Sequence, residues 1–355
     1  MCHPARWRRW TILGLSAWAL ASCGAPASEQ GPGTAALRED APGGEVRLYV
    51  ADRYESVRQL APDTLETVAT IDVGLRPHGL IVSPDHRTLY VTVETTNELV
   101  KVDLRSHEIL GRVTVGPVPN EPTITQDGRY VFVPSRGGDS CYVVDTETMT
   151  VIKQLAAGRA EHNAYTSADG HWVFVTSMGD DLITVVNAHT LEVDRQIAVG
   201  GVPRPVALTA DLSLAYVALS GLTGFVTLDL RTDAIVDLLE ISIPEDTPVP
   251  LLDTYTHGLL LTPDERELWL AAYGTHKIHA FSMPEKKHFA EIDVPGTPHW
   301  LALHPDGEPL YVTIESAGQV VAIHRGLRQV VRSAAVGEGP TRIIAVRVPD
   351  DVGRP

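Results

Sequence analysis

The chain has 355 residues, of which 44% are hydrophobic and 21% are charged, a balance that is typical of a globular protein and excludes an intrinsically disordered one. It carries 45 acidic against 29 basic residues, for a formal net charge of −16. This charge argues against a nucleic-acid partner, which needs a basic surface, and is compatible with the attraction of cationic ligands.

The N-terminus is expected to be an export signal. Three arginines stand within residues 1–9, and residues 11–20 form an apolar segment that is too short to span a bilayer. The letters LASC that end at Cys23 resemble a bacterial lipobox, in which the chain is cut before the cysteine and the cysteine is acylated. We therefore predict a lipoprotein signal peptide over 1–22 and a membrane anchor on Cys23, with an ordinary secretory signal as the alternative. By the same resemblance, Gly24 favours the outer membrane.

The rest of the chain divides into a tether, a large domain and a short tail. Residues 23–44 are rich in Gly, Ala and Pro without periodicity, which predicts a flexible tether. The domain is expected over 45–349, with a disordered tail over 350–355. Once the signal is removed, Cys141 is the one cysteine besides the anchor, so no intrachain disulfide is expected. We expect Cys141 to be a small buried residue of a strand.

One stretch recurs along the domain, beginning with VGLRPHGLIVSPD at residues 73–85. Five of the six intervals between successive copies are 42 residues and one is 53. A repeat of about 40–45 residues is the signature of a β-propeller blade. Seven equivalent marker positions predict seven blades: His78, Asn120, His162, Arg204, His257, His299 and Thr341.

Each repeat contains four short strand signals. In the repeat of His78 they lie at 80–82, 88–93, 98–102 and 109–115, each bounded by turn-forming residues. The chain shows no convincing helical period. The fold predicted is therefore an all-β, seven-bladed propeller of four-stranded blades.

The two ends of the domain are expected to share one blade. The segment from Arg47 matches strands two to four of a repeat, and residues 341–348 match strand one alone. Closing the ring in this way covers strand edges that would otherwise be exposed. We expect the closed ring to be a monomer.

Two blocks with the letters LYVT, at 89–92 and 310–313, resemble the YVTN-repeat propeller family. That resemblance implies a propeller fold and a bacterial cell-surface or periplasmic location. In other repeats the motif is degenerate, as in YVFVPS and WVFVTS. The resemblance says little about activity, because propellers carry many unrelated functions.

The marker residues are expected to ring one mouth of the propeller channel, since the first strand of each blade lines it. The pleat of a strand directs alternate residues to opposite sides, so either the markers or their successors point inward, and both remain open. The successors with polar or aromatic side chains are Glu121, Asn163, Trp300 and Arg342. The turns after the second strands add further residues to this mouth: Arg53, Glu94, Arg136, Tyr273 and Glu315.

Three interpretations of this mouth compete. The histidines stabilise turns; or they bind a metal or haem-type cofactor; or the mouth binds a small molecule or a protein without chemistry. For a metal, the predicted ligands are His257, His299 and Glu315, of which Glu315 is also a candidate general base. The propellers of nitrous-oxide reductase and haem d1 proteins are similar in carrying histidines at channel mouths, and that of streptogramin lyase pairs two histidines with a glutamate.

We predict a binding scaffold at the mouth, and no catalytic residue is assigned. The alternative is a metal- or haem-dependent enzyme, a lyase or lactone hydrolase, that uses His257, His299 and Glu315. The predicted ligand-binding residues are His78, Asn120, Glu121, His162, Asn163, Arg204, Trp300 and Arg342.

Outside the mouth, few residues suggest a site. His276 and His279 are three residues apart and would form a weak site together, whereas His288 is expected in an exposed outer loop. The longer interval before His257 adds residues within 243–255 that are expected to form a lid. The sequence has no GxSxG, Walker, CxxC or CxxCH motif.

Overall fold

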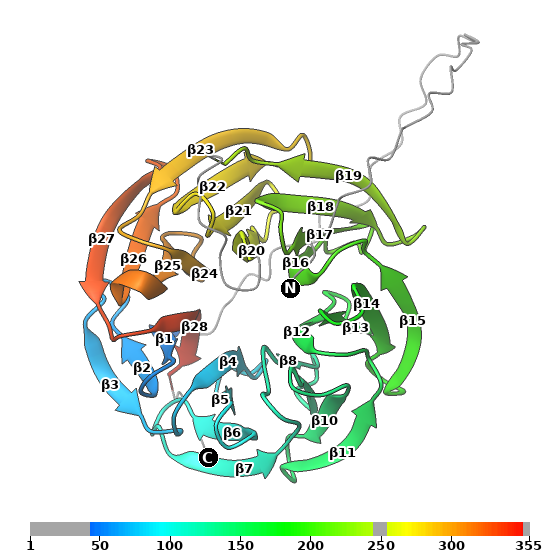
Figure 1. Ribbon diagram of the computed structural model, residues 1–355. Helices are drawn as coiled ribbons and strands as arrows, with labels where there is room; N and C mark the ends of the chain where they lie inside the picture. Colours follow the sequence, from blue (N-terminus) through cyan, green and yellow to red (C-terminus); the bar gives the residue numbers. More distant parts are fainter. Residues whose placement is uncertain (1–42, 244–253, 351–355) are drawn as a thin grey trace, which may run out of the picture. The chain divides into compact units, whose positions relative to one another are not determined.

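The computed structural model describes residues 43–243 and 254–350. Within them the predicted fold is confirmed: seven four-stranded antiparallel sheets are arranged as blades around one axis (Figure 1). No helix of the described part is long and apolar enough to cross a membrane. The predicted signal peptide, Cys23 and most of the tether fall outside the described residues, as do 244–253 of the predicted lid.

The blades are numbered from the one that contains both ends of the propeller. From innermost to outermost strand, blade 1 has β28 (Pro340–Pro349), β1 (Gly44–Asp52), β2 (Val57–Leu60) and β3 (Thr67–Ile71); blade 2 has β4 (Pro77–Val82), β5 (Thr88–Val93), β6 (Glu98–Asp103) and β7 (Ile109–Thr114); blade 3 has β8 (Thr123–Ile124), β9 (Tyr130–Pro134), β10 (Cys141–Asp145) and β11 (Thr150–Leu155); blade 4 has β12 (Glu161–Thr166), β13 (Trp172–Ser177), β14 (Leu182–Asn187) and β15 (Glu192–Ala198).

The remaining blades follow the same order. Blade 5 has β16 (Pro203–Leu208), β17 (Leu214–Leu219), β18 (Gly224–Asp229) and β19 (Ala234–Glu240); blade 6 has β20 (Thr256–Leu261), β21 (Glu267–Ala272), β22 (Lys277–Ser282) and β23 (Lys287–Asp293); blade 7 has β24 (Pro298–Leu303), β25 (Leu310–Ile314), β26 (Gln319–His324) and β27 (Gln329–Ala335). A 3-10 turn, η2 (Glu315–Ala317), follows β25. The four strands predicted for the repeat of His78 correspond to β4–β7.

The hydrophobic core is divided among the interfaces between neighbouring blades. Seven clusters of buried side chains each join two adjacent blades. In β5, Leu89 and Val91 pack toward blade 1, whereas Tyr90 between them packs toward blade 3. The second strand of a blade is therefore buried on both faces, which explains its nearly continuous apolar sequence. Cys141 of β10 is buried in such a cluster, as predicted.

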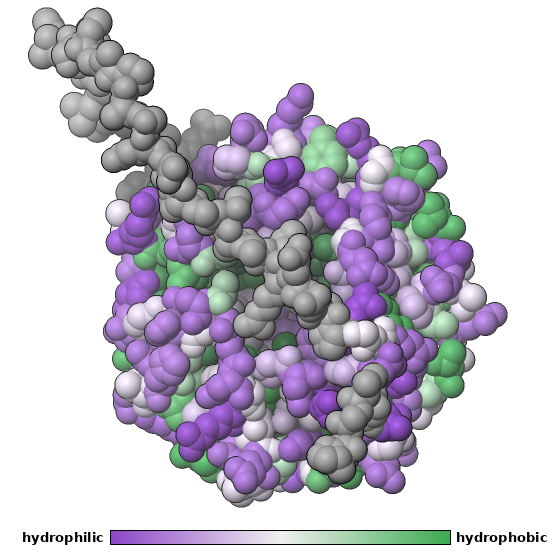
Figure 2. All heavy atoms as spheres, turned by 180° about the vertical axis from the view of Figure 1, so that it is seen from behind, coloured by the Kyte–Doolittle hydropathy of each residue, from purple (hydrophilic) through white to green (hydrophobic). Residues whose placement is uncertain are grey.

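The polar side chains gather on the surface. On the face shown in Figure 2, hydrophilic residues cover most of the area and hydrophobic ones lie between them in small patches. The outermost strands account for many of these exposed apolar residues, for example Ile109 and Leu110 of β7 and Val236 of β19. Isolated apolar residues on a surface are ordinary in folded proteins.

The ring closes between the two ends of the domain, as the repeat register predicts. Strand β28 pairs antiparallel with β1 from Gly44 opposite Pro349 to Ala51 opposite Arg342. Blade 1 thus takes its innermost strand from the C-terminal end and its other three strands from the N-terminal end.

Candidate functional site at the propeller axis

The innermost strands are not regular at the marker positions. In six of the seven blades the pairing between the first and second strands shifts there, between Pro77 and Leu80, Glu161 and Ala164, Pro203 and Val206, Thr256 and Gly258, Pro298 and Leu301, and Pro340 and Arg342. A bulge adds a residue to one strand and so interrupts strict alternation. The sequence left open whether the markers or the residues after them point toward the channel. Because of the bulges, residues of both sets reach the axis.

Threonines of the second strands hold these bulges in place. The hydroxyls of Thr92, Thr176 and Thr313 accept hydrogen bonds from the backbone N–H that follows each marker, at 2.7, 3.0 and 3.0 Å. Thr92 and Thr313 also donate to the marker carbonyl of the next blade, at 2.9 and 3.2 Å. The threonine of the repeated LYVT blocks therefore links each bulge to its neighbour.

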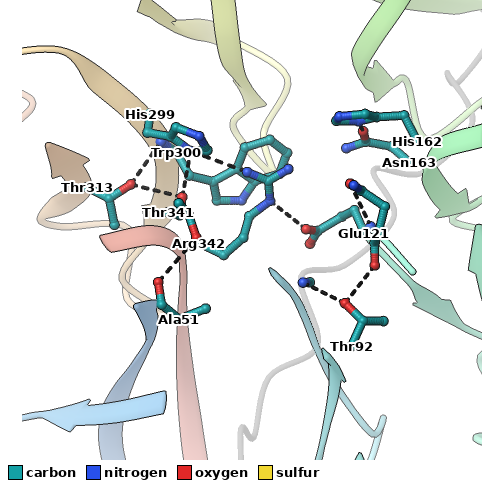
Figure 3. Close-up of polar contacts among 12 residues, drawn as sticks. Ala51, Thr92, Glu121, His162, Asn163, His299, Trp300, Thr313, Thr341 and Arg342 are labelled. Atoms are coloured by element: carbon teal, nitrogen blue, oxygen red, sulfur yellow. Dashed lines mark hydrogen bonds and ion pairs between the residues drawn. The ribbon is translucent and has the colours of Figure 1, made fainter. Parts of the chain in front are cut away.

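Arg342 crosses the axis from blade 1 to blade 3 (Figure 3). Its Nε donates to Glu121 Oε2 at 2.5 Å, and its Cζ lies 3.9 Å from the centre of the Trp300 ring. Arg342 is 1% exposed and Glu121 is 7% exposed, so both charges are removed from water. Its Nη2 is buried and has no hydrogen-bond partner in the part of the chain that the structure describes.

His299 lies beside this arginine and has a defined tautomer. Its Nδ1 is 2.7 Å from the carbonyl oxygen of Thr341, so Nδ1 carries the proton and donates it. Its Nε2 therefore holds a lone pair, 3.8 Å from Glu315 Oε2. Glu315 is itself engaged, because it pairs with Arg53 at 2.8 Å and accepts from the Tyr273 hydroxyl at 2.8 Å.

Both ring nitrogens of His162 are already in use. Its Nδ1 donates to Asn163 Oδ1, and its Nε2 accepts from Arg204 Nη1 at 3.3 Å. The amide of Asn163 in turn donates to the Tyr165 hydroxyl at 2.8 Å. His162 is therefore a support for Arg204, and a metal would have to displace that arginine to reach it.

His257 and His78 keep nitrogens that the described residues do not satisfy. The Nδ1 atoms of both are buried without a hydrogen-bond partner among those residues. The ring of His257 lies 3.7 Å from that of His299, centroid to centroid, and 6.0 and 6.3 Å from the rings of Tyr273 and Trp300. Because His257 is only half-buried, its Nε2 is the nitrogen that can meet a ligand.

The electrostatics of the site combine neutral imidazoles with crowded cations. Burial, and next a neighbouring guanidinium or imidazole, lowers the pKa of His78, His162, His257 and His299 well below 6.5, so all four are neutral at pH 7. Burial followed by repulsion from Arg136 and Arg342 lowers the pKa of Arg204 to about 10. An anion placed among these guanidinium groups would relieve the repulsion.

We call the buried or half-buried residues that meet here the axial cluster: His78, Glu121, His162, Asn163, Arg204, His257, His299, Trp300 and Arg342. Asn120, also predicted, is buried beside Glu121. Sequence reasoning missed Tyr165 and the bulge-linking threonines. The threonines recur at one position of the repeat, which was the available signal.

The predicted metal set is brought together only in part. Between residues 43 and 243 and between 254 and 350, the one group of three possible ligands whose atoms all lie within 4.8 Å is His279, His288 and Glu291, far out on blade 6. His299 Nε2 is 3.8 Å from Glu315 Oε2, but the ligand atoms of His257, His299 and Glu315 do not all lie within 4.8 Å of one another. Metal binding by these three residues stays a prediction.

Glu161, which precedes His162, makes stability depend on pH. Burial raises its pKa from 4.5 to about 9, so between these values the unfolded chain binds fewer protons than the folded one and the free energy of unfolding falls as pH rises. At pH 7 the raised pKa of Glu161 lowers the free energy of unfolding by about 3 kcal/mol. We expect Glu161→Gln to stabilise the protein at pH 7.5 and to match wild type near pH 4, in urea unfolding. The exposed Glu147→Gln serves as control; parallel pH curves for wild type and Glu161→Gln would contradict the assignment.

Comparisons with known proteins identify relatives of this fold. The family model of the cytochrome D1 heme domain matches residues 85–334. None of the curated proteins compared matches the sequence significantly.

Solved structures with the same fold include three of known activity. Hydrazine synthase of Kuenenia stuttgartiensis is 18% identical, with a TM-score of 0.67 over 76% of this chain and 95% of that one. Dihydro-heme d1 dehydrogenase NirN, in complex with DHE, is 16% identical, with a TM-score of 0.63 over 87% and 67%. The periplasmic gluconolactonase PpgL of Pseudomonas aeruginosa is 20% identical, with a TM-score of 0.69 over 86% and 99%. At these identities the likeness shows the shared fold alone.

Proposed function

The chain belongs to the cytochrome D1 heme domain family, and from this premise we propose that the axial cluster binds an anionic, metal-containing tetrapyrrole of the haem d1 class. The family supplies the class of cofactor. The side chains at the axis supply the test of whether such a group fits.

The observation that carries the proposal is the unused donor of a buried guanidinium. Arg342 Nη2 has no partner among the described residues, although an unsatisfied donor on a buried charged group is costly. Arg136 and Arg204 add positive charge near Arg342, and burial, together with repulsion among these guanidinium groups, lowers the pKa of both. Carboxylate side chains of a tetrapyrrole offer the acceptor that Arg342 Nη2 lacks.

The imidazoles fit the metal of such a group. A metal requires a neutral imidazole with a free nitrogen, and burial keeps the axial histidines neutral at pH 7. His257 is the favoured ligand because it is the more exposed: His162 is fully bonded, and His299, although its Nε2 is free, is buried and faces Glu315. The rings of Tyr273 and Trp300 lie 6.0 and 6.3 Å from that of His257 and offer flat surfaces for a macrocycle. When bound, a haem iron would supply redox chemistry and an open coordination position.

A lyase or lactone hydrolase that uses His257, His299 and Glu315 is the second candidate. The 3.8 Å approach of His299 Nε2 to Glu315 favours it, as a carboxylate facing a neutral imidazole. Glu315 is a weak general base, however, because Arg53 and Tyr273 already occupy its oxygens. A hydrolase would also leave the Arg342 donor without a role.

We place this site in the cell envelope. The N-terminal sequence supports export and acylation at Cys23, and the LYVT blocks support a relationship of individual blades to YVTN repeats. Both are proposals that rest on the sequence.

The test is a titration of the purified protein with two ligands, haem d1 and the metal-free tetrapyrrole, which carry the same carboxylate side chains. Haem d1 is expected to change its absorption spectrum and to raise the melting temperature, because a ligand of the native state stabilises it. Metal-free tetrapyrrole with the same side chains is expected to bind more weakly. Loss of one charged hydrogen bond costs about 1.5–3 kcal/mol, so Arg204→Gln should weaken both ligands by about 10- to 100-fold.

Two further variants separate binding of the metal from binding of the carboxylates. His257→Ala should weaken haem d1 and leave the metal-free compound unaffected, whereas the exposed His324→Ala should change neither. No spectral or thermal response to saturating haem d1 would refute the proposal. Hydrolysis of a lactone that disappears in His299→Ala, without haem binding, would establish the second candidate instead.

A further inference from the structure

A second group of ligating side chains lies on the outer strands of blade 6. His279 of β22 stands directly opposite Glu291 of β23. His288 is three residues before Glu291 and in a regular strand would face the other side. The register shifts between Ala280 and Phe281, and the extra residue in β23 interrupts its alternation of faces. His288 therefore lies on the same face of the sheet as His279 and Glu291. His276 is not part of this group, and its Nδ1 contacts Thr297 Oγ1. The weak site of His276 and His279 suggested by the sequence stays a prediction. His288 also lies in a strand, although it is exposed as predicted.

The tautomer of His279 directs a lone pair toward His288. The hydroxyl of Thr275 lies 2.8 Å from His279 Nε2 and 3.5 Å from the Ala272 carbonyl, so it can accept from His279 Nε2–H while it donates to that carbonyl. His279 Nδ1 is then unprotonated and lies 3.2 Å from His288 Nε2. The His288 ring is held by stacking on Phe281, 4.9 Å between centroids.

We propose that His279 Nδ1, His288 Nε2 and the Glu291 carboxylate bind a divalent transition metal such as Zn²⁺, with water as the fourth ligand. All three ligand atoms lie within 4.8 Å of one another. Two imidazole nitrogens on one tetrahedral zinc ion are about 3.3 Å apart, close to the separation seen here. The hydroxyl of Thr275 acts as the outer partner that fixes a ligating imidazole.

Lys277 is the group that competes with the metal. Its Nζ pairs with Glu291, and it also pairs with Asp293 at 3.2 Å. When Glu291 turns to the metal, the ammonium keeps Asp293 as a partner.

This site is independent of the axial cluster, because it uses the two outermost strands of its blade whereas the axial residues come from the innermost strands. It therefore stands whether or not a tetrapyrrole binds at the axis. An open fourth position on an exposed zinc ion suits either a structural clip between β22 and β23 or the binding of a further anionic ligand.

The test measures binding of Zn²⁺ alone by the full chain without a histidine tag, after stripping with a chelator. We expect His288→Ala to lower zinc affinity at this site by more than the roughly 100-fold that loss of an outer partner can cost. Lys277→Met should instead tighten binding. The matched control is His189→Ala, since His189 and His171 are an exposed pair with ring centroids 5.1 Å apart; Asp169 contacts His171, but among the described residues no third ligand atom lies within 4.8 Å of both histidines.

Cobalt supplies a second readout, as Co²⁺ absorption reports tetrahedral coordination by nitrogen and oxygen. His288 is exposed, so its substitution leaves the core of the blade intact and the melting temperature of the metal-free variant should equal that of wild type. Equal zinc affinity and stoichiometry in wild type, His288→Ala and His189→Ala would overturn the proposal. The same result would follow if zinc were held by the axial histidines instead.

Discussion

A protein that lacks residues 341–355 is expected not to fold. Strand β28 supplies Ile343 to the core shared with blade 7 and Val346 and Val348 to the core shared with blade 2. Loss of three buried aliphatic side chains costs about 5 kcal/mol or more, which approaches the 5–15 kcal/mol that stabilises a typical domain. The deletion also exposes the edge of β1 along its whole length.

Circular dichroism and size-exclusion chromatography of the truncated protein measure this effect. An exposed strand edge favours pairing with other chains, so we expect unfolded or aggregated material. The control is deletion of residues 351–355, which removes no part of β28 and should leave melting unchanged. Cooperative melting of the 341–355 deletion at the wild-type temperature would show that the ring does not depend on this closure.

The closure and the blade count could be predicted because they depend on counting strand signals along a repeat. The apolar run of β5 and its equivalents signals burial on both faces, and a spacing of 42 residues leaves little choice of architecture. None of this requires knowledge of which way a given side chain points.

Side-chain direction was where the sequence was insufficient. Strand alternation predicts one inward-facing set at the axis, yet the bulges turn both His299 and Trp300 inward. The same kind of irregularity in β23 brings His288 onto the face of Glu291. Bulges depend on the partner strand, so a single strand read by itself does not reveal them. The tautomers of His162 and His299 likewise follow from contacts with distant backbone and side chains.

Loss of the Arg342 side chain is expected to be the most damaging single substitution in the axial cluster. In Arg342→Met the carboxylate of Glu121 stays buried without its cation, and breaking a buried pair in this way costs about 3–5 kcal/mol. The stacking on Trp300, at 3.9 Å, is lost as well. We expect urea unfolding at pH 7 to show this loss and haem d1 to bind no longer.

The pH dependence of Arg342→Met, and its combination with Glu121→Gln, distinguish the loss of an ion pair from the loss of packing. Burial raises the pKa of Glu121 and Arg342 opposes that rise, so without the arginine Glu121 takes up a proton more readily and Arg342→Met should recover stability as pH falls. Glu121→Gln added to Arg342→Met should restore most of the lost stability at pH 7, because no buried charge remains. The surface pair of Arg159 and Asp180 sets the scale, since Arg159→Met should cost far less stability than Arg342→Met. If the double variant were no more stable than Arg342→Met, the loss would come from packing against Trp300, and the buried ion pair would not be what holds Arg342 across the axis.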